Sequence, residues 1–158
     1  MIEKIEARHA EVTSFVRESL RIEGIGREPW YEEVCVTRKF LNDAVVGLAE
    51  LATLVGTYEP SARLRHAQGM DVRVGDYVPP RGGEHIAERL NEIIVAAETG
   101  AADAWSTYVV YEALHPWTDG NGRSGRALWA RRHLREGGDL SQLFLNAFHY
   151  QTLRRYAR

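Results

Sequence analysis

Cysteine is nearly absent from the 158 residues, since only Cys35 occurs. A lone cysteine cannot form an internal disulfide, so a disulfide-stapled secreted scaffold is excluded and a reducing compartment is favoured. Long apolar runs are missing as well, which argues against a membrane-spanning helix, and the charged N-terminal segment is unlike a signal peptide. We therefore expect a cytoplasmic protein with no membrane partner.

Strong charge of either sign is also missing, because the net charge is only −2. A near-neutral chain gives no electrostatic case for binding nucleic acid, whose phosphates attract clustered cations. The C-terminal stretch HYQTLRRYAR interleaves aromatic and basic residues, but it fits a solvated amphipathic helix better than a nucleic-acid contact. We therefore expect no nucleic-acid partner. The histidines and Cys35 show no zinc-ligand spacing.

What the sequence does contain is typical of one soluble helical domain spanning residues 1–158, with 44% hydrophobic and 27% charged residues. Apolar residues recur at spacings of three and four in several segments, which predicts helices. The expected helices cover Ile2–Glu23, Thr37–Val55, Glu84–Glu98, Ala102–Leu114, Arg126–Arg135 and Leu140–Tyr156. Met70–Val78 instead favours two short strands around the turn Gly75–Asp76. The predicted fold class is all-α with one small β-hairpin.

The most informative segment is His115–Arg126, which reads HPWTDGNGRSGR and lies between two expected helices. Unpaired backbone N–H groups at a helix start form an anion site, and glycines let a phosphate approach the backbone closely. Arg123 and Arg126 lie three residues apart and can point at the same anion. Asp119 is a suitable Mg²⁺ ligand beside such phosphates, and His115 is the natural proton acceptor.

Two other phosphate motifs are weaker interpretations of this segment. Gly120, Gly122 and Gly125 satisfy the dinucleotide pattern GxGxxG, which requires a preceding strand and an acidic residue ending a second strand. Here a helix precedes the run, and the residues before Asp139 do not resemble a strand. A Walker A loop is excluded because no Gly-Lys-Ser/Thr sequence follows the glycines.

The complete run closely resembles the Fic-domain signature HPFxDGNGRxxR, with Trp117 in place of the usual phenylalanine. In that family the loop binds ATP with Mg²⁺ and transfers AMP to a hydroxyl of a target protein. The resemblance implies that His115 deprotonates a Ser, Thr or Tyr hydroxyl and that Asp119 holds the metal. It also implies a phosphate cradle made of Gly120, Asn121 and Gly122, with Arg123 on the departing phosphates and Arg126 on the γ-phosphate.

The same resemblance implies roles for two further regions of a Fic-fold helical bundle. A hairpin called the flap precedes the Fic signature and binds an extended target segment by strand addition, and residues 70–80 resemble it. The expected docking residues are Val72, Arg73, Val74, Tyr77 and Val78. A C-terminal helix lies near the nucleotide base in the family, so Tyr150 is a candidate adenine contact.

The first expected helix, residues 1–24, carries a second signal. Its apolar stripe ends in Ser19 and Glu23, and Glu23 lies in the last turn before Gly24, where the helix dipole disfavours negative charge. A residue that violates local rules is a candidate for function. The segment SLRIEG fits the inhibitory motif (S/T)xxxE(G/N) of Fic proteins. The resemblance implies that Glu23 pairs with Arg126 and takes the γ-phosphate position.

Three alternatives to AMP transfer remain open on the sequence. Relatives of this fold transfer other groups or phosphorylate their targets. In some relatives the inhibitory glutamate helps to remove AMP from a modified protein, which would give Glu23 the task of orienting water. The chain could also be a nucleotide-binding or toxin–antitoxin module without turnover. The sequence does not identify the target protein or the signal that would release the inhibition. It also gives no sign of whether the protein forms a homo-oligomer.

Overall fold

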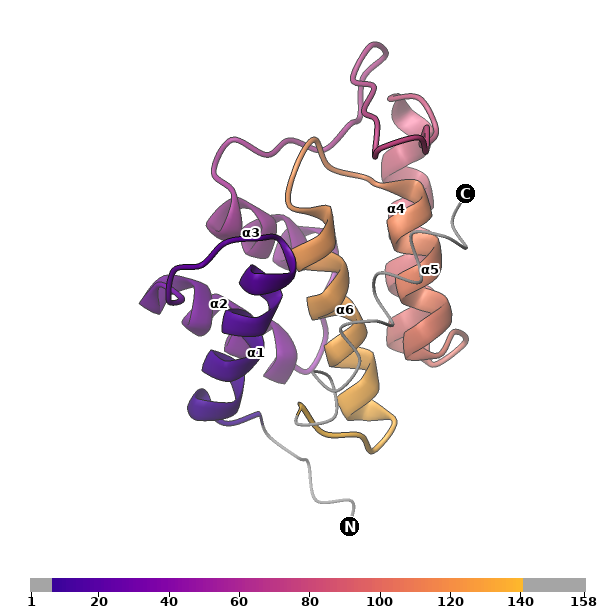
Figure 1. The fold of residues 1–158 in the computed structure, drawn as a ribbon. Helices are drawn as coiled ribbons and strands as arrows, with labels where there is room; N and C mark the ends of the chain where they lie inside the picture. The colour runs from indigo at the N-terminus through magenta and orange to yellow at the C-terminus, as the bar shows by residue number, and fades with distance from the viewer. Residues whose placement is uncertain (1–6, 141–158) are drawn as a thin grey trace.

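The computed structural model describes residues 7–140, and within that range it contains six α-helices and no strand (Figure 1). The all-α prediction is therefore confirmed for the described part. The helices are α1 (His9–Ile22), α2 (Tyr31–Asn42), α3 (Leu48–Tyr58), α4 (Glu84–Thr99), α5 (Ala104–Leu114) and α6 (Asn121–Arg135). None of these helices is long and apolar enough to cross a membrane.

Helix α6, which begins inside the signature, is the central element of the bundle. It packs against α1, α2, α3 and α5, with α1–α3 on one side and α4–α5 on the other (Figure 1). Small residues such as Gly125 and Ala127 allow this close packing, since a Cβ on Gly125 would lie 2.4 Å from a side-chain oxygen of α5. The start of α6 is therefore surrounded by several elements that are distant in sequence.

The helix predicted over Thr37–Val55 is wrong, because the chain forms α2 and α3 with a break at residues 43–47. Asp43 leaves the helical region (φ −58°, ψ 140°), and Gly47 caps α3 with its N–H bonded to Glu50 at 2.8 Å. The buried guanidinium of Arg131 on α6 donates to the carbonyls of Phe40 and Asp43, both at 2.7 Å. These long-range bonds satisfy the end of α2, and helical periodicity alone does not reveal them.

The two strands expected over Met70–Val78 do not form, although the turn between them does. Val74 and Tyr77 exchange backbone hydrogen bonds of 2.9 and 3.0 Å around Gly75–Asp76, and pairing stops at this single bridge. The flanks are anchored elsewhere: Asp71 accepts from the Gly82 N–H at 2.9 Å, and the Tyr77 hydroxyl donates to the Ala113 carbonyl at 2.6 Å. Tertiary contacts thus replace the expected β-ladder.

The remaining helix predictions differ only at their ends. α4, α5 and α6 correspond to the segments expected around Glu84–Glu98 and on both sides of the signature, and α1 corresponds to the first expected helix from His9 onward. Residues 1–6 and the helix expected over Leu140–Tyr156, beyond Leu140 itself, lie outside the described residues. The Tyr150 prediction falls there too.

Candidate active site

The signature forms a tight loop between α5 and α6, and the preceding segment 63–65 runs antiparallel to it. The Arg65 N–H donates to the Pro116 carbonyl at 2.9 Å, and the Thr118 N–H donates to the Arg63 carbonyl at 2.9 Å. Trp117 fills the loop from inside with only 5% exposure, and its indole N–H donates to the Tyr111 hydroxyl at 3.0 Å. The loop is therefore fixed by buried contacts before any ligand binds.

Asn121 holds the loop together through its side chain. Its side-chain oxygen accepts from the Trp117 N–H at 2.9 Å, and its amide donates to the Trp117 carbonyl at 2.8 Å. Both ends of the buried amide are thus engaged with the loop backbone. That Asn121 also lines a phosphate cradle stays a prediction.

His115 caps α5 in a left-handed conformation (φ 51°, ψ 61°), and no other non-glycine residue in range 7–140 has a positive φ. Such backbone strain costs about 1–3 kcal/mol and tends to persist at functional sites. The backbone of Glu112 acts on the imidazole and favours its protonated form, but less strongly than burial opposes it. Burial, followed by the positive charge of Arg65, lowers the pKa of His115 to about 4. The imidazole is neutral at pH 7, as a proton acceptor must be.

The start of α6 has the properties of an anion site, and a carboxylate of the chain lies there. A Cβ added to Gly122 would lie 2.3 Å from the Glu23 Oε1, so the carboxylate rests directly against the backbone of the first helical turn. The unpaired N–H groups and the positive end of the helix dipole both favour a negative group at this position. A side chain larger than glycine at position 122 would exclude that group.

Arg126 and the end of α1 form a buried polar contact at the same place. The Arg126 guanidinium donates to the Glu23 carboxylate at 2.7 Å, to the Ser19 hydroxyl at 2.9 Å and to the Ser19 carbonyl at 3.0 Å. Arg126 is only 3% exposed. Burial opposes its charge, but the Glu23 carboxylate, together with Tyr108 and Glu112, more than offsets burial, so the pKa of Arg126 is raised. The three residues singled out from two distant motifs, Ser19, Glu23 and Arg126, therefore meet.

Gly24 explains how Glu23 reaches this position. Gly24 has φ +76°, and its N–H donates to the Arg21 carbonyl while the Ile25 N–H donates to the Leu20 carbonyl. This pattern is a Schellman motif, which ends a helix with a glycine in the left-handed region. The helix consequently stops with Glu23 as its C-cap, facing α6.

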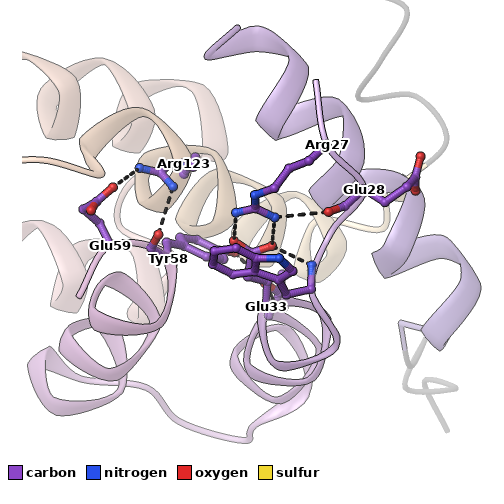
Figure 2. A network of polar contacts seen from close by, with 8 residues as sticks. Arg27, Glu28, Glu33, Tyr58, Glu59 and Arg123 are labelled. Atoms are coloured by element: carbon purple, nitrogen blue, oxygen red, sulfur yellow. Dashed lines mark hydrogen bonds and ion pairs between the residues drawn. The ribbon is translucent and has the colours of Figure 1, made fainter. Parts of the chain in front are cut away.

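Arg123 does not share an anion with Arg126 in this structure, contrary to expectation. Its guanidinium donates to the Tyr58 carbonyl at 3.0 Å and to the Glu59 carboxylate at 3.2 Å, both at the end of α3 (Figure 2). Arg126 instead turns toward α1. Arg123 would have to exchange Glu59 for a phosphate to act as predicted. Glu59 is a site residue that sequence analysis missed.

A second ion pair in Figure 2 supports the segment between α1 and α2. Arg27 donates to both carboxylate oxygens of the fully buried Glu33, at 2.7 and 3.0 Å, and Glu33 also accepts from the Trp30 N–H at 2.9 Å. Bidentate pairs of this kind hold their partners in one geometry. The segment that follows Glu23 is thereby fixed to α2.

Asp119 lies on the exposed side of the loop, where its carboxylate accepts from the Gly120 N–H at 2.7 Å. Residues 7–140 contain no group of three or more His, Cys, Asp or Glu side chains that could hold a metal ion alone. A single accessible carboxylate still suits Mg²⁺, which binds nucleotides through one or two carboxylates together with the phosphates. In the described residues the protein therefore offers one accessible carboxylate here, which fits Mg²⁺ only if a ligand supplies further oxygens.

The predicted docking residues cluster around the Gly75–Asp76 turn. Val78 is 65% exposed, whereas Val72, Val74 and Tyr77 are partly buried. The Arg73 side chain donates back to the Gly75 carbonyl at 2.9 Å and so stays within the turn. The turn lies beside the end of α5, next to His115, because the Tyr77 hydroxyl is bonded there.

Arg65 is the second residue that sequence analysis missed. It is completely buried and binds backbone carbonyls on both sides of the site. An arginine in an irregular segment gives no pattern that distinguishes it from a solvated one.

No family model matches the chain, and no curated protein matches it. The resemblance to Fic domains therefore rests on His115–Arg126 and Ser19–Gly24, two segments that the fold brings into contact.

Proposed function

We propose that this protein is an adenylyltransferase of the Fic type, which transfers AMP from ATP to a Ser, Thr or Tyr hydroxyl of a target protein and is autoinhibited by Glu23. The observation that carries the proposal is the Glu23 carboxylate, which lies against Gly122 while ion-paired with Arg126. A site that accommodates an internal carboxylate at a helix start suits a phosphate group equally well.

The chemistry requires one base and one leaving group. His115, neutral at pH 7, accepts the proton of the target hydroxyl, whose oxygen then attacks the α-phosphorus of ATP. The bond between the α-phosphorus and its bridging oxygen to the β-phosphate breaks, and pyrophosphate leaves with the electron pair. The negative phosphates beside His115 would raise its pKa, which strengthens the base once ATP is bound.

Positioning and charge stabilisation account for the rest of the catalysis. In this proposal the backbone of Gly120 and Gly122 and the Arg126 guanidinium hold the phosphate tail, and Arg123 contacts the departing phosphates after releasing Glu59. Asp119 would hold a Mg²⁺ ion, which supplies neutralisation of the phosphate charge. The exposed flank of the 70–80 turn, next to His115, would dock the target segment.

Autoinhibition follows from competition for Arg126. The γ-phosphate of a productively bound ATP requires the guanidinium that Glu23 and Ser19 now occupy. ATP that binds without displacing Glu23 keeps its tail away from Arg126, so its α-phosphorus is misaligned with His115. The autoinhibition is intramolecular, because α1 and α6 belong to one domain.

The proposal can be tested by determining which phosphate of ATP becomes attached to the protein. Glu23→Gly is incubated with Mg²⁺ and ATP labelled at either the α- or the γ-phosphate, and the intact protein is weighed. We expect self-modification with AMP that retains the α-label and is absent from Glu23→Gly/His115→Ala. Retention of the γ-label would identify a kinase instead, and the absence of any modification would remove the main support for the proposal.

One observation favours a second candidate, removal of AMP from a modified protein. The Glu23 carboxylate lies against Gly122, in the first turn of the helix that follows the loop carrying His115. A carboxylate at this place could orient water toward a phosphodiester. Wild-type protein challenged with an AMP-modified protein distinguishes the two: release of AMP that requires Glu23 favours removal.

A further inference from the structure

Arg65 lies in the irregular segment between α3 and α4 and is completely buried. Its guanidinium donates four hydrogen bonds, and in the described part of the chain all four go to backbone carbonyls. The acceptors are His115 at 2.7 Å, Leu114 at 2.9 Å, Pro80 at 2.7 Å and Met70 at 3.2 Å. Burying a cation whose hydrogen bonds all go to neutral carbonyls is costly. Burial lowers the pKa of Arg65, and the charge of Asp71 offsets this only in part.

These carbonyls belong to two parts of the proposed site. Leu114 and His115 end α5 and begin the signature loop, whereas Met70 and Pro80 lie at the two ends of the 70–80 turn. The Arg65 backbone repeats the link, because its N–H binds the Pro116 carbonyl and its carbonyl accepts from the Gly83 N–H. One residue therefore joins the base of the turn to the catalytic loop.

The contact with the His115 carbonyl acts on the strained residue itself. His115 holds a left-handed backbone that a residue with a side chain adopts only when its surroundings enforce it. The bonds from Arg65 to two successive carbonyls, those of Leu114 and His115, fix the peptide planes on both sides of the His115 Cα. The direction of the imidazole depends on these two planes.

Charge gives Arg65 a second effect on the same imidazole. After burial, the Arg65 charge is the next largest cause of the lowered pKa of His115. The carboxylates of Asp119 and Glu23 oppose it. Arg65 therefore favours the neutral imidazole as well as its orientation.

We propose that Arg65 is a positioning residue, which orients His115 for proton transfer and couples it mechanically to the target-docking turn. This inference rests on the proposed function. A lysine in its place retains the charge but cannot bridge four carbonyls, because its ammonium is a compact point donor.

Arg131 provides a matched control. It is also a buried arginine that donates to carbonyls, those of Phe40 and Asp43, and it pairs in addition with the Glu98 carboxylate. It lies at the far end of α6 from His115. We would compare Arg65→Lys with Arg131→Lys, each in the Glu23→Gly background. The rate of self-modification would be measured against ATP concentration on folded, purified protein.

We expect Arg65→Lys to lower the maximal rate about 100-fold, the order of loss that follows from misplacing a catalytic group by about 1 Å. The ATP concentration at half-maximal rate should change little, because Arg65 does not contact the phosphate cradle. Arg131→Lys should lower stability and leave both parameters unchanged. An equal rate loss in the two variants, or an unchanged rate in Arg65→Lys, would overturn the proposal.

Amide hydrogen exchange tests the coupling independently of activity. The Thr118 N–H reports on the catalytic loop and the Gly83 N–H on the base of the turn, since both are hydrogen-bonded to segment 63–65. Arg65→Lys should accelerate exchange at both amides, and Arg131→Lys at neither. If Glu23→Gly is inactive, the proposed function fails, but this readout still decides: unchanged exchange at either amide in Arg65→Lys refutes the coupling.

Discussion

Replacing Glu23 by glycine removes one carboxylate from the start of α6 and leaves Arg126 with its two bonds to Ser19. A hydrogen bond to a charged group is worth about 1.5–3 kcal/mol, and Arg126 is almost fully buried. In the wild type this free energy is lost when ATP displaces Glu23, and the observed free energy of ATP binding is weaker by that amount. At about 1.4 kcal/mol per tenfold change, the affinity of Glu23→Gly for ATP should rise about 10- to 100-fold.

The structure also predicts how the affinities of two nucleotides, ATP and ADP, change in Glu23→Gly. ADP lacks the γ-phosphate that would contact Arg126, so its affinity should rise less than that of ATP. The folded state of Glu23→Gly should lose about 1.5–3 kcal/mol of stability at the same time, because an ion pair has been removed. Isothermal titration calorimetry and thermal unfolding measure the two effects.

Controls separate this effect from a general loosening of α1. Glu23→Gln keeps the side-chain shape and the helix end but removes the charge, and it should also gain ATP affinity. Glu28→Gly breaks the surface ion pair between Glu28 and Arg17, in which the Glu28 side chain is 71% exposed. This variant should leave the ATP affinity unchanged. Equal ATP affinity in wild type, Glu23→Gly and Glu23→Gln would refute the competition. Tight ATP binding without turnover in every variant would favour a non-catalytic nucleotide-binding module.

Three further predictions address the loop itself. Because the pKa of His115 is about 4 in the folded protein and about 6.5 when unfolded, the unfolded state binds more protons between these values, so stability falls as the pH drops from 6.5 to 4. His115 contributes on the order of 3 kcal/mol to this loss of stability, and His115→Gln should remove that contribution. Urea titrations at several pH values measure it. Gly122→Ala should destabilise the wild type more than it destabilises the Glu23→Gly variant, since the added Cβ would lie 2.3 Å from Glu23 Oε1. Additive effects of the two substitutions in a double-mutant cycle would contradict that contact. Trp117→Phe should cost about 1 kcal/mol through the lost bond to Tyr111 and keep transfer activity, and a complete loss of activity would show that the indole has a further role.

Structural features with a local signal could be predicted from the sequence. The α1 stripe and the SLRIEG motif predicted that Glu23 faces inward, and the structure shows the ion pair that the motif implied between Glu23 and Arg126. The glycine-rich turn predicted that a helix follows it, although α6 begins at Asn121 rather than at the expected Arg126. The stripe and the helix start depend on residues within one or two helical turns of each other, which spacing and capping rules describe. The ion pair joins residues 103 positions apart, and only the resemblance implied it.

The errors have a common physical cause. Arg131 ends α2, Arg65 supports His115 and Arg123 binds the end of α3, each by donating to carbonyls at least 49 residues away in the chain. Every residue has a backbone carbonyl, so an acceptor of this kind leaves no trace in the amino-acid pattern. A buried arginine and a solvated one therefore look alike until the fold is known.

In the proposed mechanism the start of α6 is an anion site that the Glu23 carboxylate and the tail of ATP share. A crystal structure of Glu23→Gly with Mg²⁺ and a non-hydrolysable ATP analogue would show whether they do. We expect phosphates against Gly122, the terminal one bound by Arg126, and the His115 imidazole facing the α-phosphorus. Nucleotide bound elsewhere, with the turn at Gly122 unliganded, would contradict it.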